Sequence, residues 1–347
     1  MSLVYIGAFP PGWGGVTIKN RDLYEALVDE GVQIKKIDLH KITRQKKLGE
    51  LMKLCFAVLN RKNRFVIGIS TGMRRRFTHA LYCLNRKAMR KSILIVMGGT
   101  AARDISDDPK FMLWASQYKK IYVETDSMVN LLESKGMSNI ALYPNCRHRS
   151  SVPYISKIKE DKLKCVFFSY IQPQKGVDII LDAAKQLKDI DFVFYGNTDP
   201  SYTEEFQKEI SQLTNCVHKG IFKGSNDEVY KELKQYDVLL FPTNWDTEGV
   251  PGIIVEAKIA GLPCIVSNKS YNSELVENYN EGIVLDVNDA GCLINAIKLL
   301  DNDRELLKYL SDGSYNSSDR FYIENYIIRI VEELNASDLL ETEDKAI

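Results

Sequence analysis

Short apolar runs alternate with longer amphipathic segments along most of this chain. A short apolar run bounded by turn residues predicts a buried strand, and apolar residues that recur every three or four positions predict a helix. Strands that alternate with helices are typical of parallel sheets covered by helices on both faces. The predicted strands are Leu3–Ala8, Gln33–Asp38, Arg64–Ile69, Ser92–Met97, Lys120–Glu124 and Ile140–Tyr143, then Cys165–Ser169, Asp191–Tyr195, Cys216–Lys219, Val238–Phe241, Pro263–Val266 and Gly282–Leu285.

A linker divides this pattern at residues 146–162, where the periodicity lapses and Pro153 and paired serines interrupt it. The length of 347 residues and the 45% hydrophobic content suit a globular protein of two domains. We therefore predict an α/β protein with two doubly wound, Rossmann-like domains, residues 1–150 and 151–325, and a helix with an acidic tail at 326–347. Ligands bind such sheets at the carboxyl ends of the strands, and we expect the two domains to face a cleft there.

The segment TEGVPGIIVEAKIAGLP, residues 247–263, places Glu248 and Glu256 on either side of a glycine-rich turn. Gly249 and Gly252 precede an apolar run that opens with Ile253, which predicts the start of a buried helix. The free N–H groups of a helix start attract an anion such as a diphosphate, and carboxylates accept hydrogen bonds from sugar hydroxyls. On spacing alone, a glutamate favoured by the helix dipole and a second, solvated glutamate explain the segment equally well.

This segment resembles the Glu-x7-Glu signature of the retaining GT-B glycosyltransferases of the glycogen-synthase and mannosyltransferase type, glycosyltransferase family 4 or "group 1". Four more segments resemble the family in the same order, namely PGWGGV at 11–16, YPNC at 143–146, FFSYIQPQKGVD at 167–178 and VHKGIFKGSNDEVYKELKQYDVLLFPT at 217–243. The resemblance covers both halves of the chain. It implies a GT-B fold in which the last helix, from Phe321 to Leu334, returns toward the first domain.

The resemblance further implies transfer of a hexose-type sugar from a UDP- or GDP-linked donor to a saccharide or lipid-linked acceptor, in polysaccharide or glycolipid assembly. Glu248 would orient the sugar, Glu256 the ribose, and Lys175 would hold the diphosphate. Core packing is an alternative role for Phe222. The remaining residues implied in donor binding are Gly14, Gly15, Tyr170, Ile221, Phe222, Gly249, Gly252 and Ile253, and Trp13 would lie near the acceptor or the reacting sugar.

Two positions depart from the family pattern. The family usually has an arginine five residues ahead of its lysine, whereas this chain has Tyr170, whose hydroxyl brings no positive charge. The family often has a histidine after its fourth strand, whereas here Met97 is followed by GGTAARD, in which Thr100, Arg103 or Asp104 could contact the acceptor or the sugar. These departures leave open a non-catalytic GT-B subunit that binds a partner enzyme.

The loop GAFPPGWGGVT after the first strand also allows a dinucleotide-binding interpretation, because Asp38 ends the second strand where a ribose-binding acid would sit. The loop is longer than that fingerprint and lacks its third glycine, and both features weaken this interpretation. A nicotinamide-dependent enzyme is therefore the second and less favoured alternative. Seven scattered cysteines and four dispersed histidines contain no Cys-x-x-Cys or Cys/His cluster. We therefore expect no metal site, and no cofactor besides the donor substrate.

Charge is distributed unevenly along the chain. Residues 1–150 carry 26 basic and 12 acidic side chains, and residues 151–347 carry 20 basic and 34 acidic side chains. From Lys41 to Lys91 there are fifteen basic residues and a single acidic one, Glu50. Such a field attracts anions. Free nucleic acid is not expected as the partner, because no recognition motif accompanies the charge.

An apolar stripe lies within this basic block, and cations flank it. The pattern resembles an interfacial helix, although the same stripe would pack any helix on a sheet. We predict that the stripe and the cluster Arg74, Arg75 and Arg76 dock on an anionic membrane surface. Because the sequence has no long apolar window and no basic n-region, we expect a cytoplasmic location, with peripheral attachment at the inner face of the membrane.

Overall fold

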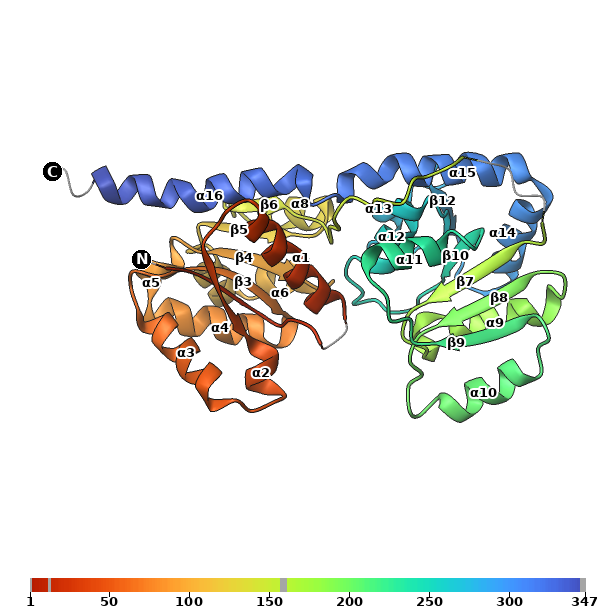
Figure 1. Ribbon diagram of the computed structural model, residues 1–347, viewed down its shortest axis with the longest axis horizontal. Helices are drawn as coiled ribbons and strands as arrows, with labels where there is room; N and C mark the ends of the chain where they lie inside the picture. The colour runs from red at the N-terminus through yellow and green to blue at the C-terminus, as the bar shows by residue number, and fades with distance from the viewer. Residues whose placement is uncertain (1, 12–13, 157–160, 344–347) are drawn as a thin grey trace. The chain divides into compact units, whose positions relative to one another are not determined.

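The computed structural model describes residues 2–11, 14–156 and 161–343, and the side chains only as far as Asn335 in the last helix. The chain forms two compact units (Figure 1). Unit 1 comprises the residues before Ser150 together with those from Phe321 onward, and unit 2 comprises Ser150–Arg320. The return of the chain to unit 1 begins at Phe321, where the resemblance placed the start of the returning segment and five residues before the predicted domain boundary at 326.

Unit 1 is built on a six-stranded parallel sheet with the order β2-β1-β3-β4-β5-β6. Its strands are β1 Leu3–Gly7, β2 Ile34–Asp38, β3 Arg64–Ser70, β4 Ile93–Met97, β5 Lys120–Val123 and β6 Ile140–Leu142. Its helices are α1 Gly15–Asp29, α2 Leu39–Thr43, α3 Leu48–Leu59, α4 Thr71–Leu84, α5 Arg86–Met89, α6 Ala101–Ser106, α7 Pro109–Ala115, α8 Asp126–Ser134 and α16 Glu324–Glu343.

The core of unit 1 joins residues from both ends of the chain. Strands β1 and β4 are buried along their whole length, as expected for central strands of a sheet covered on both faces. Helix α16 contacts α1 (Figure 1), and its apolar side chains belong to the same cluster as the β1 residues. Four buried residues of this cluster come from α16 and the position just before it, namely Ile323, Ile327, Ile330 and Leu334. The last helix thus completes the first unit.

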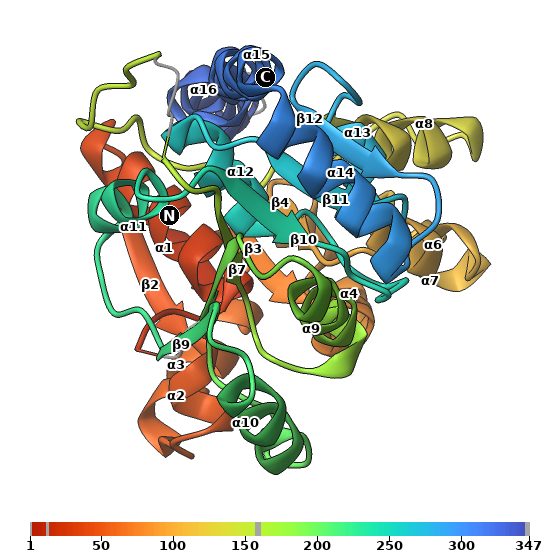
Figure 2. The same ribbon diagram turned by 90° about the vertical axis from the view of Figure 1, so that its right-hand side faces the viewer.

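Unit 2 is built on a second six-stranded parallel sheet, with the order β12-β11-β10-β7-β8-β9. Its strands are β7 Lys164–Phe168, β8 Asp191–Tyr195, β9 Cys216–Gly220, β10 Val238–Phe241, β11 Cys264–Ser267 and β12 Gly282–Leu285. Its helices are α9 Val177–Gln186, α10 Thr203–Ser211, α11 Asn226–Leu233, α12 Gly252–Ala260, α13 Asn272–Leu275, α14 Ala290–Asn302 and α15 Arg304–Ser317, with short 3-10 turns at Pro173–Lys175 and Ser318–Phe321. Figure 2 shows α9 and α14 on one face of this sheet and α11 and α12 on the other.

The two sheets confirm the prediction of two doubly wound α/β units, and each predicted strand is present. Strand order reverses between β1 and β3 in unit 1 and between β7 and β10 in unit 2. Doubly wound sheets bind ligands outside the carboxyl ends of the strands at this switch point. The loops that follow β7 and β10 are therefore the first place to look for a site in unit 2. No helix in the described ranges is long and apolar enough to cross a membrane.

Candidate active site

Lys175 and Glu248 form an ion pair at the carboxyl edge of the unit 2 sheet. The Lys175 ammonium donates to Oε2 of Glu248, and only 12% and 18% of the two side chains are exposed. Lys175 lies in the loop after β7 and Glu248 in the loop after β10, so the pair joins the two strands of the switch point. The Phe241 and Trp245 rings lie 5.4 and 5.5 Å from the lysine Nζ, which keeps the cation over aromatic faces.

The backbone holds these two loops tightly together. Gly176 has φ 76°, and a Cβ built on it would lie 1.9 Å from the carbonyl oxygen of Pro242. Only glycine fits there, because its backbone is left-handed and a second backbone approaches it. The backbone carbonyl of Gln174 accepts hydrogen bonds from the backbone N–H of Asn244 at 2.9 Å and from the Thr243 hydroxyl at 3.3 Å. Lys175 therefore sits on a rigid turn.

Two polar residues that the sequence reasoning missed support the loop after β10. Ser270, with φ 54°, donates its hydroxyl hydrogen bond to the carbonyl oxygen of Glu248. The side-chain amide of Asn288 donates to the backbone carbonyl of Pro242 at 3.0 Å and to Oδ1 of Asn244 at 2.8 Å. Both residues follow strands at the same edge of the sheet, β11 and β12, and that position is the signal that would have found them.

Helix α12 begins at Gly252, as the glycine-rich turn predicted, with Gly249 in the preceding loop. No side chain caps this helix start, and Ile253 is buried against the core. Uncapped N–H groups at a helix N-terminus offer hydrogen bonds and a favourable dipole to an anion. Glu256 is half-buried about one turn into the helix.

A buried ion pair anchors the other end of α12. The Lys258 ammonium donates to Oε2 of Glu281 at 2.6 Å and to the Ser317 hydroxyl at 2.8 Å, and the two charged side chains are 0% and 5% exposed. Arg320 donates to the same Glu281 oxygen at 3.1 Å. Burial disfavours the charged carboxylate, but its cationic neighbours outweigh burial and hold the pKa of Glu281 below its usual value. The helix start is thus fixed from behind.

Tyr170 occupies the position of the family arginine and makes a contact that the sequence did not predict. Its hydroxyl donates to Oδ2 of Asp199 at 3.2 Å, and 38% of its surface is exposed. Desolvation and the neighbouring carboxylate raise the pKa of Tyr170, so it remains a neutral donor at neutral pH. A cation at this position would meet a carboxylate.

Residues Ile221 and Phe222 follow β9, at the same carboxyl edge. Ile221 is 54% exposed, whereas Phe222 packs edge to face against Phe168 and Tyr195 with centroids 5.7 and 6.0 Å apart. The packing alternative for Phe222 therefore holds for its ring, while Ile221 presents an apolar surface. His218 is structural, since its Nε2 lies 3.0 Å from the carbonyl of Gly196 and its ring packs on the core.

In unit 1, Gly14 and Gly15 lie at the start of α1, after the first switch strand. A Cβ on either glycine would meet no heavy atom within 4 Å, so open space borders this helix start. The Thr17 hydroxyl donates to the Gly14 carbonyl at 2.9 Å and stabilises the first turn. Trp13, the residue expected near the acceptor, lies outside the described residues.

A buried ion pair inside unit 1 removes one cation from consideration as a phosphate ligand. Lys19 is 1% exposed, and its ammonium donates to Glu124 at 2.9 Å and to the Tyr143 carbonyl at 3.2 Å. The other oxygen of Glu124 accepts from the amide of Gly98 at 3.2 Å. This network fixes the loop after β4, where Thr100 donates to Asp104 at 3.0 Å.

The arginine cluster 74–76 does not form one surface patch, which corrects the sequence expectation for Arg74. Arg74 is 1% exposed and donates to the Thr71 hydroxyl at 3.0 Å and the Met97 carbonyl at 3.1 Å. Desolvation lowers its pKa to about 10. Arg75 pairs with Asp108 at 2.6 Å on the surface. The spacing of α4 turns Arg74 inward while its neighbours face out.

Asp38, the residue that allowed a dinucleotide-binding interpretation, has a structural role. It is 5% exposed, and its Oδ1 accepts hydrogen bonds from the amide of His40 at 2.9 Å and that of Phe9 at 3.3 Å. The carboxylate thus caps α2 and ties it to the loop after β1. These contacts disfavour a ribose-binding role.

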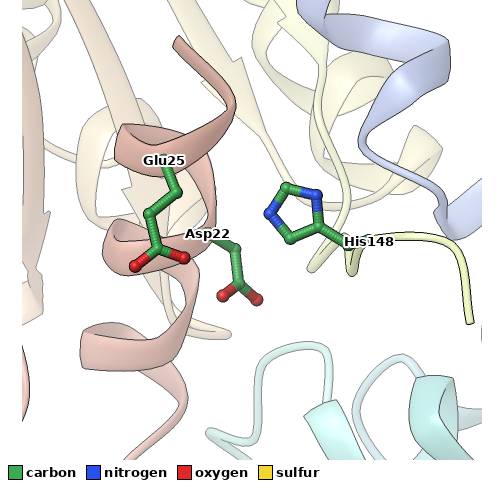
Figure 3. A group of neighbouring side chains, drawn as sticks. All are labelled: Asp22, Glu25 and His148. Atoms are coloured by element: carbon green, nitrogen blue, oxygen red, sulfur yellow. The ribbon is translucent and has the colours of Figure 1, made fainter. Parts of the chain in front are cut away.

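A histidine and two carboxylates lie close together in unit 1 (Figure 3). Potential ligand atoms of Asp22, Glu25 and His148 all lie within 4.8 Å of one another, the one such group found in the described ranges. Arg21 already pairs with Asp22 at 2.7 Å, and Glu324 lies 3.6 Å from Nδ1 of His148. The group is thus part of a mixed network of charges at one side of α1. The sequence expectation of no metal stays a prediction.

Comparison with known families and proteins finds one family model and several related proteins. Residues 151–317 match the family model "Glycosyl transferases group 1". The UDP-Gal:alpha-D-GlcNAc-diphosphoundecaprenol alpha-1,3-galactosyltransferase of Escherichia coli is 30% identical over 155 residues, 43% of this chain and 39% of that protein. An uncharacterized glycosyltransferase of Methanocaldococcus jannaschii is 28% identical over 62% of each chain. The match to these curated relatives thus spans 39% and 62% of their length.

Solved structures match the whole chain at low sequence identity. Anabaena Alr3699/HepE in complex with UDP aligns with a TM-score of 0.72 and 14% identity over 97% of this chain and 100% of that one. Sucrose-phosphate synthase from Thermosynechococcus elongatus aligns with a TM-score of 0.73 and 13% identity over 100% of both. These matches concern the fold, and they agree with the GT-B architecture that the sequence predicted.

Proposed function

We propose that the chain is a retaining glycosyltransferase, because residues 151–317 match the group 1 glycosyltransferase model and the geometry of unit 2 suits this reaction. It moves a hexose-type sugar from a nucleoside-diphosphate donor to an acceptor hydroxyl. The observation that carries the proposal is the Lys175–Glu248 pair, held at the switch point of the sheet ahead of the α12 start.

Charge on the departing diphosphate is the main demand of this reaction. The Lys175 ammonium and the uncapped start of α12 at Gly252 supply positive potential without reorganisation, because the turn at Gly176 and the buried anchor of α12 fix both. Tyr170 lies on the same loop, and its hydroxyl, which donates to Asp199, would have to turn away from that carboxylate to donate to the diphosphate. We assign no resident metal and no further cofactor to this chemistry.

The two glutamates select the sugars on either side of the diphosphate. Glu248 accepts hydrogen bonds from hydroxyls of the transferred sugar, and Glu256 from the ribose. Ile221 and the rim of Phe222 line the base. Gly14 and Gly15 remain a prediction for the donor phosphates.

During transfer, the bond between the anomeric carbon and the diphosphate oxygen breaks and the bond to the acceptor oxygen forms. The acceptor proton leaves on the departing diphosphate. The incoming oxygen takes the face that the leaving group vacates, so the anomeric configuration is retained.

The names of related proteins support a UDP-linked donor and a lipid-linked acceptor. The Escherichia coli relative is named for transfer from UDP-Gal to a diphosphoundecaprenol-linked sugar, and the Anabaena structure was solved in complex with UDP. We propose a role in glycan or glycolipid assembly at the cytoplasmic face of the membrane. The particular sugar is left to experiment.

A donor panel tests the proposal. Pure protein is screened by thermal shift and by transfer to water or to a soluble saccharide, with UDP-glucose, UDP-galactose, UDP-N-acetylglucosamine and GDP-mannose. We expect one donor to raise the melting temperature and to be turned over, and Glu256→Gln to remove most turnover, because it weakens the ribose contact.

The rival interpretation, a non-catalytic GT-B subunit, is favoured by the Tyr170–Asp199 contact that replaces a cation. Donor binding without turnover, including with a lipid-linked acceptor, would support that rival. If no donor binds and no donor is turned over, the proposal is refuted.

A further inference from the structure

Helix α3 presents an apolar stripe to solvent, although it belongs to a folded unit. Val58 is the one residue of this helix that is buried. The large apolar side chains that face outward are Leu48 with 67% of its surface exposed, Leu51 with 41%, Met52 with 50%, Phe56 with 69% and Leu59 with 59%. These positions recur at helical spacing and therefore form a single face.

The exposure of this stripe argues against one of the two interpretations that the sequence left open, namely packing on a sheet. A helix that packs on a sheet buries its apolar face, as α9 does with Val177, Ile180 and Leu181. In α3 the reverse holds, because no described segment of the chain covers the stripe and Phe56 is among the most exposed of the large hydrophobic side chains that the structure describes. Isolated exposed apolar residues need no explanation, but a contiguous set on one helix marks an interaction surface.

Cations border both ends of the stripe. Arg44, Lys46 and Lys47 precede α3 and Arg61 and Lys62 follow it, and all five are exposed. Lys53, on the helix itself, pairs with Glu50 at 2.8 Å, the one acid of this basic block. The surface thus combines an apolar centre with a cationic rim.

We propose that α3 docks unit 1 on an anionic lipid surface. The stripe enters the boundary between headgroups and acyl chains, while the flanking cations stay at the level of the lipid phosphates. A second copy of this chain would match the apolar stripe but would bring like-charged rims together. Nucleic acid would match the rim but would leave the aliphatic side chains exposed. Of these three partners, anionic lipid alone satisfies both parts of the surface.

Docking adds a location to the proposed transfer reaction, but it rests on α3 alone and its test requires no turnover. Co-sedimentation is measured with phosphatidylcholine vesicles that contain increasing fractions of phosphatidylglycerol, at low and moderate salt. We expect binding that rises with the anionic fraction and weakens with salt.

Matched variants separate the apolar from the charged contribution. Phe56→Ser with Leu59→Ser removes part of the stripe, and its control is Leu113→Ser on α7, where the side chain is 55% exposed in the same unit. Lys46→Gln with Lys47→Gln removes part of the rim and should weaken binding by about fivefold per residue. Because all of these side chains are exposed, the variants should fold normally, as circular dichroism and thermal melting will verify.

A second readout uses Cys55, whose exposed thiol lies on the same helix. After Cys83→Ser removes the other exposed cysteine, a polarity-sensitive fluorophore on Cys55 should shift to the blue on vesicles. Binding that ignores lipid charge, or that is equally strong in the Phe56 double variant and the Leu113 control, would overturn the proposal. A dimer that Phe56→Ser abolishes in sedimentation velocity would assign the face to a second copy and overturn it as well. Turnover of a soluble acceptor should be the same in the α3 variants as in the wild type. If the wild type shows no turnover at all, that result bears on the proposed function and not on docking.

Discussion

Replacing Gly176 by alanine should disable the donor site through a single methyl group. The residue has φ 76°, a backbone conformation that costs an L-amino acid about 1–2 kcal/mol relative to glycine. The new Cβ would also lie 1.9 Å from the Pro242 carbonyl oxygen and 2.7 Å from its carbon, whereas ordinary contacts begin at 3.4 Å. Backbone surrounds the position, so the turn must move by more than an ångström.

The turn that must move is the one that carries Lys175 toward Glu248. A displacement of about 1 Å from a productive geometry lowers rates by about 100-fold, which corresponds to about 2.7 kcal/mol of lost transition-state stabilisation. We therefore expect kcat/KM for the preferred donor to fall about 100-fold in Gly176→Ala. Urea unfolding should show a stability loss above the 1–2 kcal/mol of the backbone alone, by the part of the clash that the turn does not relieve.

Gly31 provides a matched control, because it has φ 77° and a Cβ there would meet no heavy atom within 4 Å. Gly31→Ala should lose about 1–2 kcal/mol of stability and leave kcat/KM close to that of the wild type. If the two alanine variants behave alike in both measurements, the turn at Gly176 is not the rigid support of Lys175, and the account of the site given above is wrong.

Three further changes test other parts of the site and its support. Lys175→Ala should weaken nucleoside-diphosphate binding in calorimetry and remove most turnover, whereas the surface control Lys185→Ala should do neither; equal affinities would remove Lys175 from the site. Tyr170→Arg should tighten binding by at most about 1.5–3 kcal/mol, and the gain should be larger when Asp199→Asn frees the new cation, so a smaller gain in the double variant would contradict the contact described. Glu281→Gln leaves a buried lysine without its partner and should lose about 3–5 kcal/mol at pH 7 in urea unfolding. The folded pKa of Glu281 lies below the unfolded value of about 4.5, so its contribution to the free energy of unfolding is complete above pH 4.5 and disappears as the pH falls further. In a plot of stability against pH, the acid limb of the variant should therefore be flatter than that of the wild type. Parallel acid limbs would count against this.

Local patterns predicted most of the fold, because the strands of these parallel sheets are buried on both faces and read as apolar runs. The start of α12 at Gly252 was also predictable, since a glycine-rich turn before an apolar run is a local signal. The pairing of Lys175 with Glu248 was not, because it depends on which strands are neighbours in the sheet.

Charged residues were the least predictable part. The sequence does not distinguish Lys19 and Arg74, which lie inside unit 1, from the solvated cations around them. Their burial depends on partners far along the chain, such as Glu124 and the carbonyl of Met97. The stripe of α3 was visible in the sequence, but whether a sheet or another surface covers it is a property of the tertiary fold.

Unit 1 is made of two chain segments that are separated by the whole of unit 2. During synthesis, the ribosome must release all of residues 150–320 before Ile323, Ile327, Ile330 and Leu334 become available to the core that begins with β1. Unit 2 is continuous and has its complete core earlier. N-terminal domains usually finish folding first. In this protein the core of unit 1 cannot be completed until all of unit 2 has been synthesised.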